Sequence, residues 1–267
     1  MDKSNQPPTR QKLLSSDIQN LANDALAAAR GNLNPETSKR IETASDWLER
    51  YCLSSKFEAS TAVDTLTSRG LQVDAIVDYC IPQIARNYGQ EWINDSLSFA
   101  TVSVGCAHLQ LVLKHIIHQR GFIIANGKGT CILLAAVAPE QHTLGALVLA
   151  DQLRRLDFSV KLCIGASTED VTNIVLENKF EAVLFSASSV ETVKASAQCV
   201  KKIRQSYTDQ PLVFLGGSIL SSHSSEELPN VFDYVTNKLD GIVNSIENAQ
   251  ITVSEGTQRA VGNEKQF

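Results

Sequence analysis

The sequence predicts a helical bundle followed by an α/β domain, and three observations support this fold class. The chain has 267 residues, which exceeds the commonest size of a single domain. Up to about residue 125, apolar residues recur at spacings of three and four, as in amphipathic helices. Beyond a glycine-containing link at 121–130, five short apolar runs alternate with helical segments. Such runs are typical of a parallel sheet that is covered on both faces.

The N-terminal half is predicted to form four or five helices. Residues 11–30 form the first, within an N-terminal arm that spans 1–34. The second begins at Pro35, because proline is favoured at the first helical position. Residues 57–92 continue the bundle, with Gly70 as a helix C-cap and Pro82 as a position for a kink. The last helix starts near Ser98 and reaches His118, so the bundle spans 35–122.

The C-terminal half is predicted to form a five-stranded, doubly wound, flavodoxin-like domain over residues 128–250. The expected strands lie within 130–138, 158–166, 180–188, 211–218 and 232–237. The expected helices lie within 142–156, 169–178, 189–205 and 238–250. In this architecture a ligand binds at the carboxyl ends of the strands. Residues 251–267 have no sustained apolar face and are predicted to be a mobile tail.

Composition narrows the function classes. Lys and Arg number 24 and Asp and Glu 29, so the net charge of −5 gives no overall attraction to a phosphate backbone. We find no run of about 18 apolar residues and no apolar stretch of a signal peptide at the start, which predicts a cytoplasmic protein without a membrane segment. The six cysteines lie far apart, without a C-x-x-C pair, and are interpreted as buried thiols.

The most informative local segment is APEQHTLG, residues 138–145, which follows the first strand of the sheet and opens its first helix. His142 at this edge can bind a metal through its imidazole, and Glu140 can orient the other ring nitrogen. Gly145 lets a large ligand come close to the start of the helix. The alternative is a histidine that is merely solvated or caps the helix. No G-x-G-x-x-G is present at this turn, which disfavours a nicotinamide or flavin site.

Two further features fall at the same edge. Ser186-x-Ser188 follows the third strand, and Gly216-Gly217 follows the fourth. Taken singly, such serines are usually helix caps and such glycines are usually turns. Together with E-x-H-x-x-G, the set resembles the cobalamin-binding domain over residues 128–250. That resemblance implies a slot for the displaced nucleotide tail of cobalamin.

The resemblance also assigns roles to these residues. It implies that His142 is the lower axial ligand of cobalt and that Glu140 is its carboxylate partner. Ser186 and Ser188 would contact the nucleotide, and Gly216 with Gly217 would leave room for it. The cofactor would be adenosylcobalamin, methylcobalamin or hydroxocobalamin. Glu140 replaces the Asp of most cobalamin-dependent methyltransferases and mutases, and corrinoid-dependent light sensors often carry Glu here.

The bundle carries a second match. YGQEWINDSLSFA at 88–100 and the following residues to Gln110 resemble the G-x-x-W-x-x-D-x-L-S-F-A signature of the AerR/PpaA family. The two matches together span about residues 70–250. Trp92 is the residue that would shield the upper face of the corrin, and its alternative is ordinary core packing. Asp95 is expected to cap the next helix. Ser103 and His108 depart from the Thr and Arg of the family.

The resemblance implies a regulator and not an enzyme: a cobalamin-binding, light-responsive antirepressor of photosynthesis genes. Its partner would be a repressor of the PpsR/CrtJ type. No direct contact with nucleic acid is expected, because too few residues precede the bundle for a winged-helix DNA reader. The alternative is a corrinoid carrier protein of a methyltransferase system. The oligomeric state stays open.

Three histidines on the last bundle helix, His108, His115 and His118, invite two further interpretations. His115-x-x-His118 resembles a metal pair but has no Cys or acidic partner at ligand spacing, so metal binding is disfavoured. One of the three could serve as an upper cobalt ligand after light removes the alkyl group. Nothing in the sequence selects among them.

Overall fold

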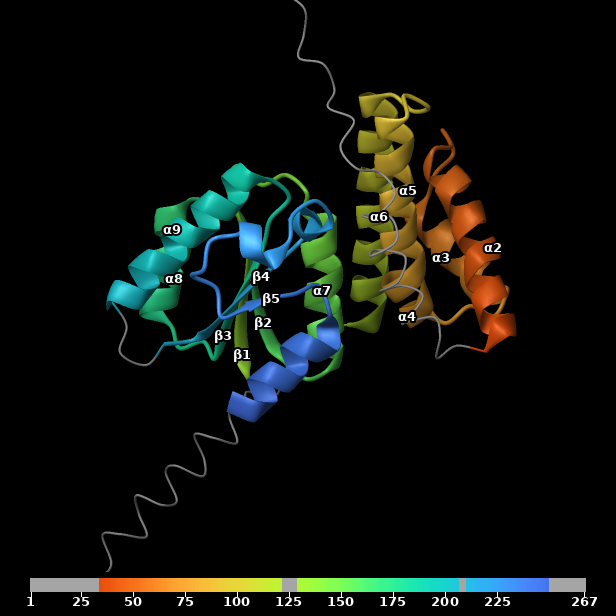
Figure 1. Ribbon diagram of the computed structural model, residues 1–267. Coiled ribbons are helices and arrows are strands. Elements are labelled where there is room, and N and C mark those ends of the chain that lie inside the picture. The colour runs from red at the N-terminus through yellow and green to blue at the C-terminus, as the bar shows by residue number, and fades with distance from the viewer. Residues whose placement is uncertain (1–33, 122–128, 207–209, 250–267) are drawn as a thin grey trace, which may run out of the picture.

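The computed structural model describes residues 34–121, 129–206 and 210–249. Figure 1 shows a helical bundle beside an α/β domain, with α6 of the bundle next to α7 of the sheet domain. The predicted helix at 11–30 and the predicted tail at 251–267 lie outside the described residues, as does most of the predicted link at 121–130. The predicted fold class is confirmed.

The bundle begins as predicted. Helix α2 runs over Pro35–Cys52, and the Asn34 side chain caps it by accepting from the Thr37 N–H at 2.8 Å. Helix α3 spans Ala59–Ser68 and ends in a Schellman turn. Gly70 has a φ of +81° there, and its N–H donates to the Thr67 carbonyl at 2.9 Å. The prediction that Gly70 ends a helix is therefore confirmed.

The third helical run accommodates its proline by widening one turn. It consists of α4 (Val73–Ala75), the π-helical turn η1 (Ile76–Cys80) and α5 (Ile81–Ile93). Pro82 lies two residues after the wide turn, at the second position of α5. Because proline lacks an N–H and its ring crowds the carbonyl four residues earlier, a π turn is a local way to keep the helix going.

Helix α6 (Phe99–Arg120) completes the bundle. Its N-cap is Ser98, whose side chain accepts from the Thr101 N–H at 3.1 Å. The expectation that Asp95 caps this helix is wrong: Asp95 adopts a φ of +58° in the preceding turn, three residues too early. The side chain two residues closer to the helix, Leu97, packs against the bundle core instead.

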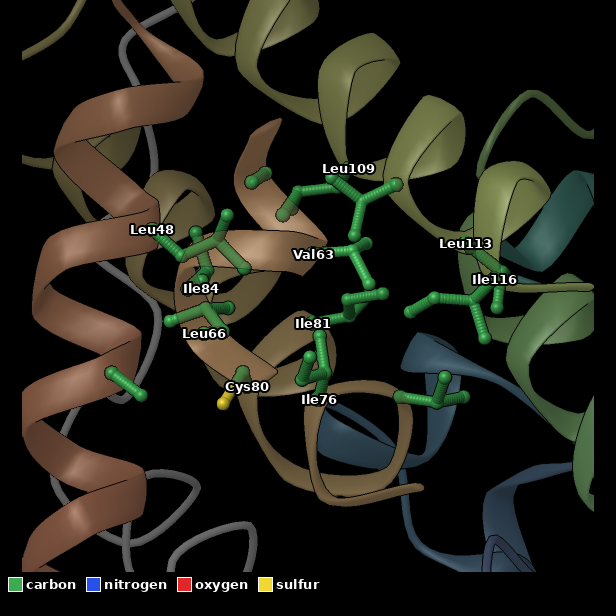
Figure 2. Packing of buried hydrophobic residues seen from close by; sticks show 14 of the residues in the cluster. Leu48, Val63, Leu66, Ile76, Cys80, Ile81, Ile84, Leu109, Leu113 and Ile116 are labelled. Carbon is green, nitrogen blue, oxygen red and sulfur yellow. The ribbon is translucent and has the colours of Figure 1, made fainter. Parts of the chain in front are cut away.

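The core of the bundle is formed by aliphatic side chains from all its helices. Figure 2 shows residues such as Leu48, Leu66, Ile84 and Leu109 meeting between the helices. By length and composition alone, helix α6 is long and apolar enough to span a membrane, and 28% of its most apolar 18-residue stretch is buried within the protein. This is weak evidence for a membrane, because core helices of bundles meet the same criteria. Within the described residues it is the one helix that does so.

The sheet has the predicted five parallel strands in the order β2-β1-β3-β4-β5. They are β1 (Cys131–Val137), β2 (Ser159–Ala166), β3 (Ala182–Ser186), β4 (Leu212–Gly216) and β5 (Tyr234–Val235). Helices α8 (Thr168–Glu177) and α9 (Val190–Ser206) cover one face. Helix α7 (Leu144–Arg155) and the helical residues 239–249 cover the other.

Helix α7 packs against both parts of the molecule. Its Ala146, Ala150 and Leu153 face the sheet, while Val148 joins the core of the bundle. An ion-pair network closes the junction, with the Arg120 guanidinium on α6 donating twice to Asp151 at 2.8 Å. Arg155 bridges Asp78 and Asp151 beside it. The junction therefore combines apolar packing with paired charges.

The cysteines are less uniformly buried than expected. All six are free thiols; Cys52, Cys80 and Cys199 are buried, whereas Cys106, Cys131 and Cys163 are only half-buried. Each strand cysteine lies near an end or on an edge strand of the sheet, which leaves part of its side chain uncovered. Burial raises the pKa of Cys52 to about 12, so that thiol stays protonated.

Candidate functional site

Glu140 is the anchor of the carboxyl edge of the sheet. Its N–H donates to the Val137 carbonyl at 2.9 Å, which turns the chain sharply after β1 and places the side chain inside the loop. The residue is only 5% exposed. Its carboxylate accepts the backbone N–H of His142 at 2.6 Å and the ring Nδ1 of His142 at 3.1 Å. The histidine is thereby fixed at two points.

Ser188 completes this corner from the loop after β3. Its N–H donates to Glu140 at 2.6 Å and its hydroxyl donates to Glu140 at 2.8 Å. The contact of Ser188 with a nucleotide stays a prediction, whereas its hydrogen bonds to Glu140 are a contact within the protein that the sequence analysis did not predict. Ser186 lies at the end of β3, in register with Gly216. We refer to Glu140, His142 and Ser188 as the edge triad.

Hydrogen bonds within the edge triad shift the pKa values of Glu140 and His142. Burial acts to raise the pKa of Glu140, but hydrogen bonds from His142 and Ser188 outweigh it and lower the pKa to about 2. The carboxylate is therefore charged at neutral pH. Its hydrogen bond raises the pKa of His142 in turn. The side chain of His142 is 78% exposed, and the ring nitrogen that Glu140 does not contact, Nε2, is the one suited to bind a metal.

The glycines of this edge serve different purposes. A Cβ added to Gly145, near the start of α7, would meet no atom within 4 Å. A Cβ on Gly217 would lie 2.2 Å from the Ala187 carbonyl oxygen, and φ there is +108°. A Cβ on Gly216 would lie 2.9 Å from the Thr236 carbonyl oxygen. Close packing within the protein is thus sufficient reason for both Gly216 and Gly217, whereas Gly145 faces open space.

Asn237 is a site residue that the sequence analysis missed. Its side-chain oxygen accepts the Gly217 N–H at 2.7 Å, and its amide donates to the Gly217 carbonyl at 3.0 Å. The amide therefore clamps the turn after β4 from both sides. Its position two residues after β5, at the same carboxyl edge, was the available signal.

The bundle projects beyond this edge. Gln110 of α6 donates to the Thr143 hydroxyl at 3.3 Å, while Arg120 reaches Asp151, so α6 and α7 run parallel. Residues 99–109 of α6 therefore extend past the start of α7, by roughly 15 Å at the rise of an α-helix. Figure 1 shows this end of the bundle, with the α5–α6 connection, reaching past the sheet. It forms a wall beside the edge that carries His142.

The projecting end carries exposed aromatic residues. Trp92 at the end of α5 is 42% exposed and Phe99 is 68% exposed, with ring centroids 6.1 Å apart. Ile93 between them in sequence is 63% exposed. Trp92 is therefore a surface residue and not a core residue, in line with the expected shielding role. We call Trp92, Ile93 and Phe99 the cap patch.

The three histidines of α6 are not part of the cap patch. His108 contacts the Cys52 carbonyl through Nδ1 at 2.6 Å and stacks on Phe57 at 4.0 Å, inside the bundle. The Nε2 atom of His115 is buried without a hydrogen-bond partner. His118 lies in the last turn of α6, far along the helix from the projecting end. Among the described residues, no group of three or more His, Cys, Asp or Glu is arranged to hold a metal ion.

Comparison with known proteins defines the class of the molecule. Residues 130–241 match the family model described as B12 binding domain. The fold is similar to that of the monomethylamine corrinoid protein of Methanosarcina barkeri, with a TM-score of 0.62 and 11% identity over 79% of this chain and 99% of that one. This likeness supports the arrangement of bundle and sheet. The chain thus contains a B12 binding domain, and cobalamin is its cofactor.

A relative by sequence is more specific. The chain is 29% identical over 183 residues to the uncharacterized 20.5 kDa protein in the bchF-crtJ intergenic region of Rhodobacter capsulatus. The match covers 67% of this chain and 94% of that protein. This relative agrees with the resemblance that the motifs of the bundle and the sheet edge predicted.

The donor set of the described structure fits the cofactor. A cobalt-ligating imidazole needs one ring nitrogen exposed and the other oriented by an acceptor, and His142 with Glu140 meets both conditions. Gly145 leaves the start of α7 uncovered beside it. His142 would hold the cobalt through its exposed ring nitrogen.

Proposed function

We propose that the protein is a light-responsive antirepressor that binds a PpsR/CrtJ-type repressor of photosynthesis genes. The observation that carries this proposal is the relative whose gene lies between bchF and crtJ. The sequence resemblance names CrtJ-type proteins as partners of this family, so gene position and resemblance agree. The net charge of −5 supports action through a protein and not through direct contact with DNA.

The chain's own residues suggest how the signal would pass. An alkylcobalamin, when bound, supplies a light-sensitive cobalt–carbon bond. Glu140 and Ser188 hold His142 in one orientation, so the position of this ligand would change little. The side chains of the cap patch are exposed and two of its rings contact each other, so a rearrangement of these side chains would alter the bundle surface offered to a partner.

The first experiment is a dark titration of the protein with adenosylcobalamin, followed by visible spectra before and after green light. We expect a base-off, His-ligated spectrum that changes on illumination. His142→Ala should lose that ligation and weaken binding by one to two orders of magnitude, a loss of about 1.4–2.8 kcal/mol. His118→Ala is the matched control, because His118 lies on α6 away from the edge. A His142→Ala protein with unchanged spectrum and affinity would contradict the assignment.

The second experiment measures the regulatory step. A purified PpsR/CrtJ-type repressor is bound to its operator DNA, and the cobalamin-loaded protein is added in the dark and after illumination. We expect the DNA complex to weaken in one of the two states and not in the other. Equal DNA binding in both states would reject a light-responsive antirepressor. Methyl transfer from a methyl donor system, measured in parallel, would favour the corrinoid carrier instead.

A further inference from the structure

A groove lies between α2 and α3 of the bundle. Its volume is about 290 Å³. The floor is apolar and buried: Ala44, Leu66 and Leu71 are 8%, 0% and 7% exposed. Figure 1 shows α2 and α3 on the outer side of the bundle, with α6 between them and α7. The groove is therefore separate from the edge that carries His142.

The rim of the groove is cationic. Lys39, Arg40 and Arg69 line it, with Glu36 as the one acidic residue among the lining side chains. The Arg69 guanidinium lies over the Trp47 ring, 5.0 Å from its centre, while Arg40 forms an exposed ion pair with Glu36 at 2.5 Å. Groups that are ordered before binding lose less entropy when a carboxylate pairs with them.

This charge is unusual for the molecule. The whole chain carries −5, and a second cavity on the same bundle is lined by Asp46, Glu49 and Glu91, with Arg50 as its one cation. An apolar floor with cations on the rim suits an amphipathic helix with an apolar stripe and acidic flanks. A nucleic acid would leave the apolar floor without a partner. Residues 1–33 of the chain are a poor match, because they hold four cationic and three acidic residues.

We infer that this groove, formed by α2 and α3, is the surface that binds the repressor, through an acidic amphipathic helix of that partner. The inference rests on the proposed function, because it names the surface by which the antirepressor engages its repressor. The groove itself stands on geometry and charge independent of cobalamin. The cap patch lies where α5 ends and α6 begins, and the groove lies on α2 and α3 of the same bundle, so a shift of the bundle helices can link them.

The test compares two charge reversals of equal size. Lys39→Glu with Arg40→Glu reverses the rim, while Lys201→Glu with Lys202→Glu reverses two exposed lysines on α9. Binding to a purified PpsR/CrtJ-type repressor is measured by isothermal titration at two salt concentrations. We expect the rim variant to bind at least tenfold more weakly, with a smaller dependence on salt, and the α9 variant to bind within twofold of the original protein. Both variants should keep the cobalamin affinity and the far-UV spectrum.

A photo-crosslinking measurement locates the partner. A benzoylphenylalanine is placed at Thr43, which lines the groove, or at the neighbouring exposed Glu42, which does not. Crosslinks from position 43 to an acidic segment of the repressor support the inference. Two results would reject the groove as the binding surface while the proposed antirepressor function stands. One is a crosslink from position 43 to residues 1–33 of the same chain. The other is equal binding by both charge variants while a complex with the repressor still forms. If the original protein forms no complex with the repressor, the proposed function falls together with the groove.

Discussion

The edge triad and the cap patch lie at the same end of the molecule but are built in opposite ways. Glu140 is buried and accepts four hydrogen bonds from His142 and Ser188. The cap patch is exposed, and its one described ring contact joins Trp92 to Phe99. A side chain that binds cobalt in a fixed direction benefits from several hydrogen bonds that hold its orientation. A cover that moves benefits from making few contacts that the motion would disrupt.

The largest change in stability is expected from substitution of a glycine at the carboxyl edge of the sheet. Gly217→Ala forces a side chain against the Ala187 backbone at a positive φ, and we expect a loss of about 3 kcal/mol in the free energy of unfolding. Gly145→Ala is the matched control and should change it by less than about 1 kcal/mol. Urea unfolding of the two variants measures both.

Cobalamin titration of the same two proteins separates fold from function. If Gly145 is needed for the approach of the cofactor, Gly145→Ala should lower cobalamin affinity while its unfolding curve stays in place. Unaltered affinity in this variant would show that the open space at the start of α7 is not used by the ligand.

The next largest effect should come from the carboxylate itself. Glu140→Gln keeps the shape of the side chain but turns an acceptor oxygen into a donor that opposes the N–H groups of His142 or Ser188. We expect a loss of about 1–3 kcal/mol in unfolding free energy and loss of the His-ligated spectrum. Glu169→Gln, at an exposed position of α8, is the control and should behave as the original protein.

Acid unfolding offers a second measurement of the same group. Because the pKa of Glu140 is lowered to about 2 in the folded protein, its stabilisation is complete above the ordinary Glu value and is lost as pH falls toward 2. The difference in stability between the original protein and Glu140→Gln should therefore shrink between about pH 4.5 and pH 2. A constant difference over that range would mean that the charge of Glu140 does not stabilise the fold.

The sheet was predictable because its strands are continuous apolar runs with turn residues after them, and the same runs located His142 at the carboxyl edge. The hydrogen bond from Ser188 to Glu140 was not, since it joins residues 48 apart in the chain. Its existence depends on how two loops meet, which no local pattern encodes. Asn237 was missed for a related reason: its partner is backbone of Gly217, so no motif of side chains marks the pair.

The bundle shows the opposite limit of sequence reasoning. Helix spacing predicted α2 and α6 closely, because Asn34 and Ser98 cap them. The same spacing could not decide whether Trp92 is buried or exposed, because a tryptophan at the end of a helix can be either. The exposure of Trp92 follows from its place in the last turn of α5, where the chain leaves the helix toward α6.

A smaller effect should follow from protonation of His142. Its hydrogen bond to Glu140 raises its pKa, so the folded protein without cobalt holds this proton to a higher pH than the unfolded chain does. The resulting stabilisation is present below the ordinary histidine pKa of about 6.5 and fades as pH rises through the folded value. Cobalt needs the neutral ring, so acidification should replace the His-ligated spectrum by one without His ligation.

The midpoint of that spectral change is the quantity to compare. Weakening the carboxylate by Glu140→Gln removes the cause of the raised pKa, and the midpoint should move to lower pH in whatever fraction of protein still ligates cobalt. An unchanged pH midpoint in this variant would mean that a group other than Glu140 sets the pKa of His142.

The smallest effect on stability is expected at the cap patch. Trp92→Ala removes a side chain that is 42% exposed, so the free energy of unfolding should change by less than about 1 kcal/mol. Trp47→Ala is the counterpart, because Trp47 stacks on Tyr51 at 4.8 Å and packs against the bundle core, and it should cost about 3 kcal/mol. Yet Trp92→Ala, and not Trp47→Ala, should change how fast light alters the bound-cobalamin spectrum. If Trp92→Ala instead destabilises the fold as much as Trp47→Ala and leaves the light response unchanged, the cap patch is structural and the contrast with the edge triad disappears.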